Sequence, residues 1–235
     1  MRQPPRITLV ILSCNRADEL RRTVEHALAL PERPPIIVVD NGSADGAGRR
    51  IAASFRSVRV LQLPRNLGAC ARNEGARLAR TPYIAFSDDD TIWTAGSLAR
   101  AQALLDRYPS VAVLCGRVLV GAHRREDPVC AAMARSPLPS AGLPGPRLLG
   151  FLAGASAVRR DAFLAAGGYA PRFFIGGEEE LLALDLLAAG WSLAYVPELT
   201  ILHFPSAQRE RRRREQLLLR NRLWTAWMRR APSSA

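Results

Sequence analysis

The sequence predicts an α/β fold, in which helices flank a Rossmann-like, mostly parallel central sheet. Two observations support this prediction: short apolar runs alternate with segments of helical spacing, and acidic or polar residues follow several of these runs. Unbroken apolar runs are typical of parallel strands that are buried on both faces. Their alternation with helices favours right-handed crossover connections within one sheet.

The first half of the chain contains the most regular strand–helix units. Proline ends both predicted helices, because the residue before a proline disfavours helical geometry. Ligands of such sheets bind at the carboxyl ends of the strands, so we expect the polar residues that follow the strands to gather at one edge. The predicted strands are Ile7–Leu12, Ile36–Val39, Val58–Leu63 and Tyr83–Phe86, and the predicted helices are Arg16–Leu30 and Gly68–Arg80.

The second half of the chain is less regular. Between Asp127 and Gly150 lie five prolines and several small residues, which predict a long, mobile loop. We expect this loop to become ordered when ligands bind. The predicted strands are Val111–Val120, Phe151–Arg159, Leu193–Val196 and Thr200–Leu202, and the predicted helices are Asp161–Ala166 and Glu178–Ala189, the latter ended by Gly190.

Composition excludes several classes of protein. All basic residues are arginine, and the segment from Pro205 to Arg230 carries +7 of the net charge of +12. Because this charge lies mostly outside the main domain and no aromatic-rich RNA-binding motif occurs, we expect no nucleic-acid partner. The four cysteines form no C-x-x-C pair, so no zinc or redox site is predicted. Without a signal peptide or an apolar stretch of about 20 residues, a cytoplasmic location is expected.

The acidic triplet Asp88-Asp89-Asp90 directly follows a predicted strand. Side chains alternate along an extended chain, so Asp88 and Asp90 are expected to point the same way. Two adjacent carboxylates are unfavourable unless a cation lies between them. The triplet therefore predicts a site for Mg²⁺ or Mn²⁺ with phosphate oxygens. An acidic surface turn is the alternative interpretation.

Polar residues after two other strands are candidate nucleotide ligands. Asp40 closes the second strand, where a carboxylate can accept hydrogen bonds from a base or ribose. Asn66 precedes Gly68 at the start of a predicted helix, and Arg72 in that helix can reach a diphosphate. Each also has a local interpretation, in which Asp40 and Asn66 cap a turn or a helix and Arg72 is solvated.

A second acidic run, Glu178-Glu179-Glu180, begins a predicted helix after Gly176-Gly177. The helix dipole favours carboxylates at this position, so simple capping is an alternative to catalysis. His203 follows a short predicted strand, and a lone histidine is more often structural than a ligand.

Together these motifs resemble family 2 glycosyltransferases with the GT-A fold. Each motif alone is common, whereas their order and their positions relative to the strands are specific. The matching elements extend over about residues 6–206. They are Ser13-Cys14-Asn15-Arg16, Val39-Asp40-Asn41-Gly42-Ser43, Asn66-Leu67-Gly68, Ala71-Arg72-Asn73, Phe86-Ser87-Asp88-Asp89-Asp90, Gly167-Gly168-Tyr169, and Phe173-Phe174 leading to Gly177-Glu178-Glu179.

The resemblance implies transfer of a sugar, with inversion, from a nucleoside-diphosphate sugar to a hydroxyl of a glycan or lipid-linked acceptor. It implies a divalent metal held by Asp90 and Asp88 and completed by His203. In the family, the second acidic motif is Glu-Asp, and its aspartate is the general base. The matching position in this chain is Glu179, so the resemblance implies Glu179 as the base, with Glu178 or Glu180 as alternatives. The implied nucleotide-sugar ligands are Ser13, Asn15, Arg16, Asp40, Asn66, Arg72, Asp88 and Asp89.

Two other enzyme classes and an inactive relative are the alternatives. A sugar-phosphate nucleotidyltransferase also combines an α/β sheet with acidic metal ligands, but its first strand typically leads into a glycine-rich loop, which Ser13–Arg16 lacks. A dinucleotide oxidoreductase requires G-x-G-x-x-G after the first strand, and this motif is absent. A catalytically inactive, sugar-binding relative is the third alternative.

We divide the chain into a GT-A domain, residues 1–205, and a basic amphipathic helix and tail, residues 206–235. Within the domain, residues 1–120 form the nucleotide-binding half and residues 121–205 the acceptor half. The oligomeric state is not indicated by the sequence.

The C-terminal segment has the pattern of a helix at a membrane interface, with arginine on one face and tryptophan and leucine on the other. Such a helix would place the protein peripherally on the inner face of the membrane. The alternative is that the apolar stripe packs onto the domain. The cationic cluster is Arg209 and Arg211–Arg214, and the stripe is Leu219, Leu223 and Trp227, with Leu217, Trp224 and Met228 beside it.

Overall fold

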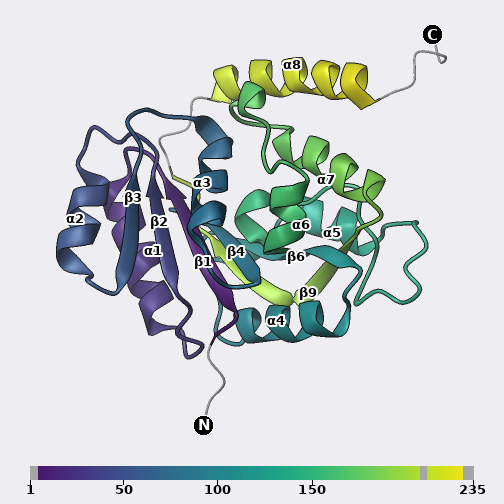
Figure 1. Cartoon of the computed structure of the whole chain (residues 1–235), viewed down its shortest axis with the longest axis horizontal. Helices are drawn as coiled ribbons and strands as arrows, with labels where there is room; N and C mark the ends of the chain where they lie inside the picture. Colours follow the sequence, from purple (N-terminus) through teal and green to yellow (C-terminus); the bar gives the residue numbers. More distant parts are fainter. Residues whose placement is uncertain (1–4, 207–210, 230–235) are drawn as a thin grey trace.

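A nine-stranded mixed sheet forms the centre of the computed structural model, which describes residues 5–206 and 211–229 without the side chains of residues 211–214. Helices cover the sheet on its faces (Figure 1). The strand order is β3-β2-β1-β4-β8-β6-β9-β5, and β7 pairs with β6. The predicted α/β fold with a central sheet flanked by helices is therefore confirmed.

The first half of the sheet is parallel, as predicted. It comprises β1 (Ile7–Ser13), β2 (Ile36–Asp40), β3 (Val58–Gln62) and β4 (Tyr83–Asp88), connected by α1 (Ala17–Ala29), α2 (Ala47–Ser54), the 3-10 turn η1 (Gly68–Cys70) and α3 (Ala71–Leu78). Helix α2 has no counterpart in the sequence prediction. It is only two turns long and buries Ala47, Gly48 and Ile51, too few apolar positions for a clear helical period.

Beyond β4 the sheet becomes mixed, because β8 (Ser156–Arg159) pairs antiparallel with both β4 and β6. The remaining strands are β5 (Thr91–Trp93), β6 (Val111–Val120), β7 (Arg125–Glu126) and β9 (Ser192–His203), and the remaining helices are α4 (Ser97–Arg107), α5 (Pro128–Ala134), α6 (Arg160–Ala165), α7 (Glu178–Ala188) and α8 (Arg211–Arg229), with short 3-10 turns η2 (Ala153–Ala155) and η3 (Pro171–Phe173).

Strand β9 is one strand of 12 residues, where the sequence predicted two short strands. Its partner β6 pairs Gly116 with Val196 and then Arg117 with Thr200, so the three residues between Val196 and Thr200 form a bulge. Pro197 lies in this bulge, where a ladder hydrogen bond from its nitrogen is not required. Proline therefore bends the strand without ending it.

The segment between Asp127 and Gly150, predicted to be one long loop, contains a helix, and its mobility stays a prediction. Its first part is α5, whose N-cap Asp127 accepts a hydrogen bond from the Val129 N–H. Its last part is held against β9, since Leu148 N–H donates to Leu193 O and Tyr195 N–H donates to Pro146 O, both at 2.9 Å. These backbone bonds join to β9 a segment that has little side-chain periodicity.

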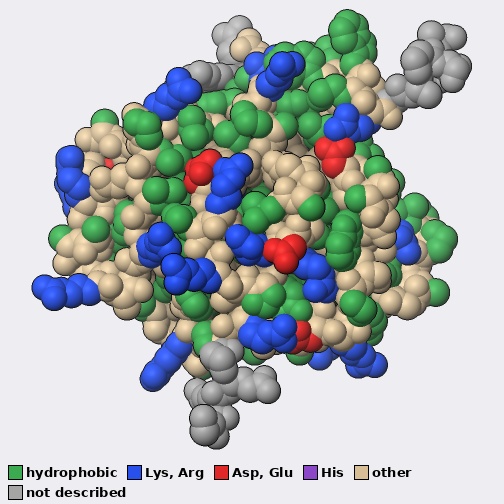
Figure 2. All heavy atoms as spheres, viewed as in Figure 1, with side chains coloured by type: hydrophobic (Ala, Val, Ile, Leu, Met, Phe, Trp, Pro, Cys, Tyr) green, Lys and Arg blue, Asp and Glu red, His purple; other side chains and the backbone are tan. Residues whose placement is uncertain are grey.

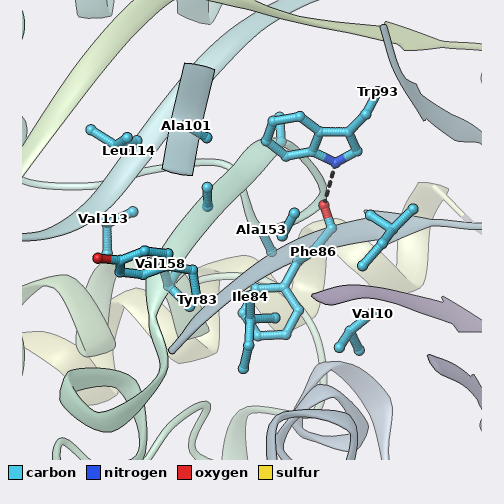
Figure 3. Close-up of a cluster of buried hydrophobic side chains, with 14 of the residues drawn as sticks. Val10, Tyr83, Ile84, Phe86, Trp93, Ala101, Val113, Leu114, Ala153 and Val158 are labelled. Atoms are coloured by element: carbon cyan, nitrogen blue, oxygen red, sulfur yellow. Dashed lines mark hydrogen bonds between the residues drawn. The ribbon is translucent and has the colours of Figure 1, made fainter. Parts of the chain in front are cut away.

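A buried aromatic contact anchors the end of β4, which carries the acidic triplet. The Trp93 indole N–H donates to Phe86 O at 3.0 Å (Figure 3). Ser87 Oγ donates to Thr91 O at 2.8 Å, which closes the turn between β4 and β5. The position of the acidic turn is therefore determined by the hydrophobic core directly beneath it.

Helix α8 lies along the outside of the molecule, next to α7 (Figure 1). Of the predicted cationic cluster, Arg209 and the side chains of Arg211–Arg214 lie outside the described residues. Among the helices of the described part of the chain, none is long and apolar enough to cross a membrane. Arginine side chains are spread over the face of the molecule shown in Figure 2, with few acidic side chains between them.

The contact of α3 with the sheet gives a test of the packing. A Cβ added at Gly75 would collide with Val10 Cγ1 and lie 3.0 Å from Val39 Cγ2. Gly75→Val is therefore expected to lower the free energy of unfolding by about 1–3 kcal/mol through overpacking, measured by urea denaturation. Gly150→Val is the matched control, because a Cβ there meets no atom within 4 Å. Equal stability of the two variants would contradict this account of the packing.

Candidate functional site

The parallel register brings the predicted site residues to one edge of the sheet. Ser13 at the end of β1 pairs with Asp40 at the end of β2, and Leu12 pairs with Asp88 at the end of β4. Because these strand ends are neighbours, the residues that follow them surround one region. The expected gathering of polar residues at the carboxyl edge is confirmed.

Asp40 is buried and organises the turn that follows it. Its Oδ1 accepts a hydrogen bond from Ser43 N–H at 3.1 Å, and its Oδ2 accepts one from Gly48 N–H at 3.0 Å. A Cβ at Gly48 would collide with Asp40 Oδ2, so glycine allows the helix to approach. The local capping role is therefore present, and each carboxylate oxygen retains a lone pair for a further donor.

Two asparagines shape the turns beside Asp40. Asn15 has a φ of 55°, and its Oδ1 accepts a hydrogen bond from Ala44 N–H at 2.7 Å. Asn66 Oδ1 accepts from Gly68 N–H at 2.8 Å and from Asn41 Nδ2 at 2.9 Å. Asn41, to which the sequence assigned no ligand role, thus joins the turn after β2 to the turn before α3.

The acidic triplet is surrounded by arginine. Arg72, which is buried, makes a close ion pair with Asp88, and Arg16 lies 2.9 Å from Asp89 Oδ1 and 3.5 Å from Asp90 Oδ2. Burial raises the pKa of Asp89 to about 6, against the lowering effect of Arg16. The two arginines therefore lie where they can contact the acidic turn or a bound anion.

The expectation that Asp88 and Asp90 point the same way is not met. Strand β4 ends at Asp88, and residues 89 and 90 form a turn, so the alternation of an extended chain stops there. Asp88 contacts Arg72 from α3, whereas Asp90 contacts Arg16 and His203.

His203 is brought beside the triplet by the last strand pair. β5 and β9 are antiparallel with Thr91 opposite His203, and His203 Nε2 lies 3.6 Å from Asp90 Oδ1. No group of three or more His, Cys, Asp or Glu side chains in the described residues is arranged as a metal cluster. Two carboxylates with one imidazole nevertheless form a donor set that suits Mn²⁺ or Mg²⁺, and Asp90 and His203 are already adjacent.

The second acidic run occupies the first turn of α7. Glu178 is 3% exposed, and its Oε2 has no hydrogen-bond partner within the described part of the chain. Burial, followed by the charge of Glu179, raises the pKa of Glu178 to about 7. Glu179 is half-buried and Glu180 is exposed. A carboxylate that titrates near neutrality is suited to acid–base chemistry.

The segment before α7 connects this acidic run to the turn before α3. Phe174 O accepts a hydrogen bond from Ala69 N–H at 2.6 Å, and a Cβ at Gly68 would collide with the Phe174 carbonyl. The Arg72 guanidinium lies 5.9 Å from the centre of the Tyr169 ring, which completes this side of the site.

No function was predicted from the sequence for Asn73 or for the turn Gly167–Tyr169. Asn73 exchanges hydrogen bonds with the backbone of Tyr169, both at 2.9 Å, and a Cβ at Gly168 would contact Asn73 Oδ1 at 2.5 Å. The two motifs therefore lock α3 to the turn after α6. This contact depends on Asn73 being buried in its helix, and a single sequence does not show whether a polar helix residue is buried or exposed.

The chain resembles characterised proteins along most of its length. A family model described as Glycosyl transferase family 2 matches residues 8–165. The N-acetylglucosaminyl-diphospho-decaprenol L-rhamnosyltransferase of Mycobacterium tuberculosis is 28% identical over 234 residues, covering 84% of this chain and 75% of the relative. A pre-mycofactocin glycosyltransferase from the same species is 30% identical over 206 residues, covering 84% of this chain and 42% of the relative.

Solved structures show the same fold. GalNAc-T7 with UDP, GalNAc and Mn²⁺ superposes with a TM-score of 0.71 at 17% identity, covering 94% of this chain and 47% of the other. The mannosyltransferase PcManGT of Pyrobaculum calidifontis with GDP-Man and Mn²⁺ gives 0.67 at 18% identity, covering 89% and 59%. These neighbours confirm the predicted GT-A fold. Because the family model matches more than half of the residues, the chain belongs to glycosyl transferase family 2.

Proposed function

We propose that the chain transfers a sugar from a nucleoside-diphosphate sugar to a hydroxyl acceptor, with inversion at the anomeric carbon. The observation that carries this proposal is that two acidic groups lie around Arg72, which pairs with Asp88 of the Asp88–Asp90 turn and interacts electrostatically with Glu178 and Glu179 at the start of α7. Structural neighbours contain UDP, GDP-Man and Mn²⁺, which supports a donor and a metal of this kind.

The donor nucleotide is proposed to bind over the turns at the ends of β1 and β2. Each carboxylate oxygen of Asp40 has a lone pair that its backbone hydrogen bond does not use, so Asp40 accepts hydrogen bonds from the base or ribose. Ser13, Asn15 and Asn66 form the surrounding surface. Arg72 and Arg16 bind the diphosphate, because guanidinium groups match phosphate oxygens in charge and geometry. Asp88 and Asp89, which contact these arginines, lie beside the same ligand.

Asp90 and His203, with Asp88, are the residues that would hold a divalent metal. The adjacent Asp90 carboxylate and His203 imidazole fit such an ion, and Asp88, whose side chain is 38% exposed, supplies a further oxygen if it leaves Arg72. When bound, the metal supplies Lewis-acid stabilisation of the diphosphate leaving group.

Glu179 is proposed as the general base. The acceptor hydroxyl gives its proton to the Glu179 carboxylate while its oxygen forms the new bond to the anomeric carbon. The bond from that carbon to the diphosphate oxygen breaks, and the nucleoside diphosphate leaves with the electron pair. Arg72 and Arg16 stabilise the charge that develops on the leaving group. Glu178 is the alternative base.

The acceptor is proposed to be a lipid-linked or cell-envelope glycan. The rhamnosyltransferase relative is named for an N-acetylglucosaminyl-diphospho-decaprenol substrate, which motivates this assignment. Transfer would then take place at the cytoplasmic face of the membrane. Residues 1–120 form the donor half and residues 121–205 the acceptor half, with residues 206–235 as a separate basic segment.

Family membership leaves the nucleotidyltransferase alternative without support. An inactive, sugar-binding relative would bind a nucleoside diphosphate but transfer nothing. A transfer assay with a panel of nucleotide sugars, beside binding measurements with UDP and GDP, separates the two functions.

Divalent metal is expected to be required for transfer. EDTA treatment should abolish activity, and Mn²⁺ should restore it in the wild type but not in Asp90→Asn, whose kcat/KM should fall about 10²-fold or more. Mn²⁺ binding in the presence of UDP, measured by electron paramagnetic resonance, should fall with it. Asp161→Asn, which changes an exposed aspartate, is the control. Full activity after EDTA treatment together with an active Asp90→Asn variant would remove the metal from the mechanism.

Loss of the base should separate turnover from donor binding. Glu179→Gln is expected to lower kcat on the order of 10²-fold or more while the affinity for the nucleoside diphosphate is kept. Glu180→Gln, on the exposed side of the same helical turn, tests the other alternative base and is expected to keep the wild-type kcat. If Glu178→Gln gives the large loss and Glu179→Gln is near wild type, the role belongs to Glu178.

The pH profile should report on Glu178. Its pKa of about 7 means that it is mostly neutral below this pH and ionised above it. Ionisation places a negative charge beside Glu179, which strengthens Glu179 as a base. We therefore expect kcat to rise as the pH passes through about 7 in the wild type. Glu178→Gln should lack this rise, and an unchanged profile would show that Glu178 does not control it.

A further inference from the structure

Helix α8 packs on the domain through Asn221 and Thr225 and through apolar residues beside them, since the Trp224 ring centroid lies 6.0 Å from that of Phe173 and Leu218 lies against Gly176. Asn221 is fully buried and Thr225 is 3% exposed, although both are polar. In contrast, Leu219 is 65%, Leu223 61% and Trp227 90% exposed. The alternative in which the apolar stripe packs onto the domain is therefore wrong for Leu219, Leu223 and Trp227, whereas Trp224 beside the stripe does contact the domain at Phe173. Figure 2 shows hydrophobic side chains along the outer edge of the molecule where α8 lies.

Several contacts fix α8 in this orientation. The Asn221 side-chain amide donates to the carbonyls of Phe173 and Gly176. Arg229 forms two hydrogen-bonded contacts with the Asp185 carboxylate of α7, at 2.6 and 3.0 Å. The stripe thus stays outward because the opposite side of the helix is engaged.

We propose that the stripe Leu219, Leu223 and Trp227 docks α8 onto an anionic lipid leaflet. Exposed tryptophan and leucine with neighbouring arginine are the composition of helices that lie in the membrane interface. Arg222 is exposed between the stripe residues, and residues 205–230 carry a net charge of +7. This charge complements an anionic surface.

Charge also distinguishes the leaflet from a second copy of the chain. Pairing two stripes would bring two basic segments together, and like charges disfavour such association. Docking on lipid neutralises the same charge. The functional role of this docking rests on the proposed function, because a lipid-linked acceptor would lie in the same leaflet as α8. Helix α8 packs on α7, and α7 begins at the Glu178-Glu179 pair.

Vesicle co-sedimentation tests the docking surface without any transfer reaction. The full chain should bind phosphatidylglycerol–phosphatidylcholine vesicles at least tenfold more tightly than pure phosphatidylcholine vesicles, and high salt should weaken this binding. The double variant Leu223→Ser, Trp227→Ser should lose the binding and keep its fold by circular dichroism, because both residues are exposed. Val129→Ser, at an exposed apolar residue on α5, is the matched control and should bind like the wild type.

Equal binding by the wild type and the double variant would overturn the docking surface, as would equal binding to both vesicle types. If light scattering shows a dimer for the wild type and a monomer for the double variant, the stripe is instead an interface with a second copy of the chain. Transfer to a water-soluble acceptor should be unchanged in the double variant. Failure of that reaction in the wild type would instead count against the proposed function.

A second, independent observation concerns the segment between η3 and α7. Phe174 has a φ of 63°, and Gly176 and Gly177 have φ values of 88° and 86°. Glycine pairs give the backbone little conformational preference of their own. The segment is held from one side by the Ala69 N–H and from the other by Asn221, whose amide also contacts Ile175 O at 3.2 Å.

We propose that Asn221 is a positioning residue for the acidic pair. Its amide holds the carbonyls of the segment that leads directly into Glu178 and Glu179, and the Asn221 Oδ1 is itself held by Arg220 at 2.9 and 3.0 Å. Without this amide the glycine pair is free to turn, and the start of α7 moves relative to the donor turn. Asn221 lies on α8, and the carbonyls that it contacts belong to the segment before α7 rather than to the residues proposed to bind the donor.

Thr225→Ala is the matched control, because Thr225 is buried one turn further on the same face of α8 and its Oγ1 has no partner within the described residues. Asn221→Ala should lower kcat at least tenfold, with the affinity for UDP or GDP in the presence of Mn²⁺ unchanged. Thr225→Ala should keep the wild-type kcat. A wild-type kcat in Asn221→Ala, an equal loss in both variants, or a parallel loss of nucleotide affinity would overturn the positioning role. An inactive wild type would instead contradict the proposed function.

Discussion

Three consecutive carboxylates at the end of a buried strand require opposite charge beside them, because removing a charge from water is costly without a partner. In this chain the compensation comes from Arg16, at the start of α1, and Arg72, in α3. Both helices follow strands whose carboxyl ends form the same sheet edge. The acidic turn, two helices and three strands are therefore tied together by one set of ion pairs, and the remaining site is built around them.

The same ion pairs explain why this edge suits a charged ligand. Arg72 is buried, is paired with Asp88 and lies against the Tyr169 ring, so its guanidinium is oriented before any ligand arrives. Orientation in advance is what makes a charge effective in stabilising a transition state. On the opposite side, Phe174 O joins the segment that leads into Glu178 and Glu179 to the turn that leads into α3. The acidic run of α7 and the start of α3 are thus connected by a backbone hydrogen bond.

Much of this arrangement follows from residue patterns. β1, β2 and β4 were predictable because each is an uninterrupted apolar run that ends in a polar residue, and the parallel pairing of such strands puts Ser13, Asp40 and Asp88 side by side. The orientation of Asp90 was not predictable, because the strand ends at Asp88, two residues before Asp90, and side-chain alternation does not continue through the turn. The contact of Pro146 and Leu148 with β9 was missed since backbone hydrogen bonds leave no side-chain pattern in the sequence.

The orientation of helix α8 on the domain was not predictable from its sequence pattern, for a physical reason. Periodicity identifies an apolar stripe but does not say which face meets the domain. The domain offers α8 the carbonyls of residues 173, 175 and 176. The Asn221 amide donates to all three, and Arg220 also donates to the Phe173 carbonyl. Unmet buried carbonyls would cost more than an exposed leucine, because an exposed apolar side chain loses only the gain of burial. Asn221 and Thr225 therefore take the inner position together with the half-buried Trp224, and Leu219, Leu223 and Trp227 remain exposed.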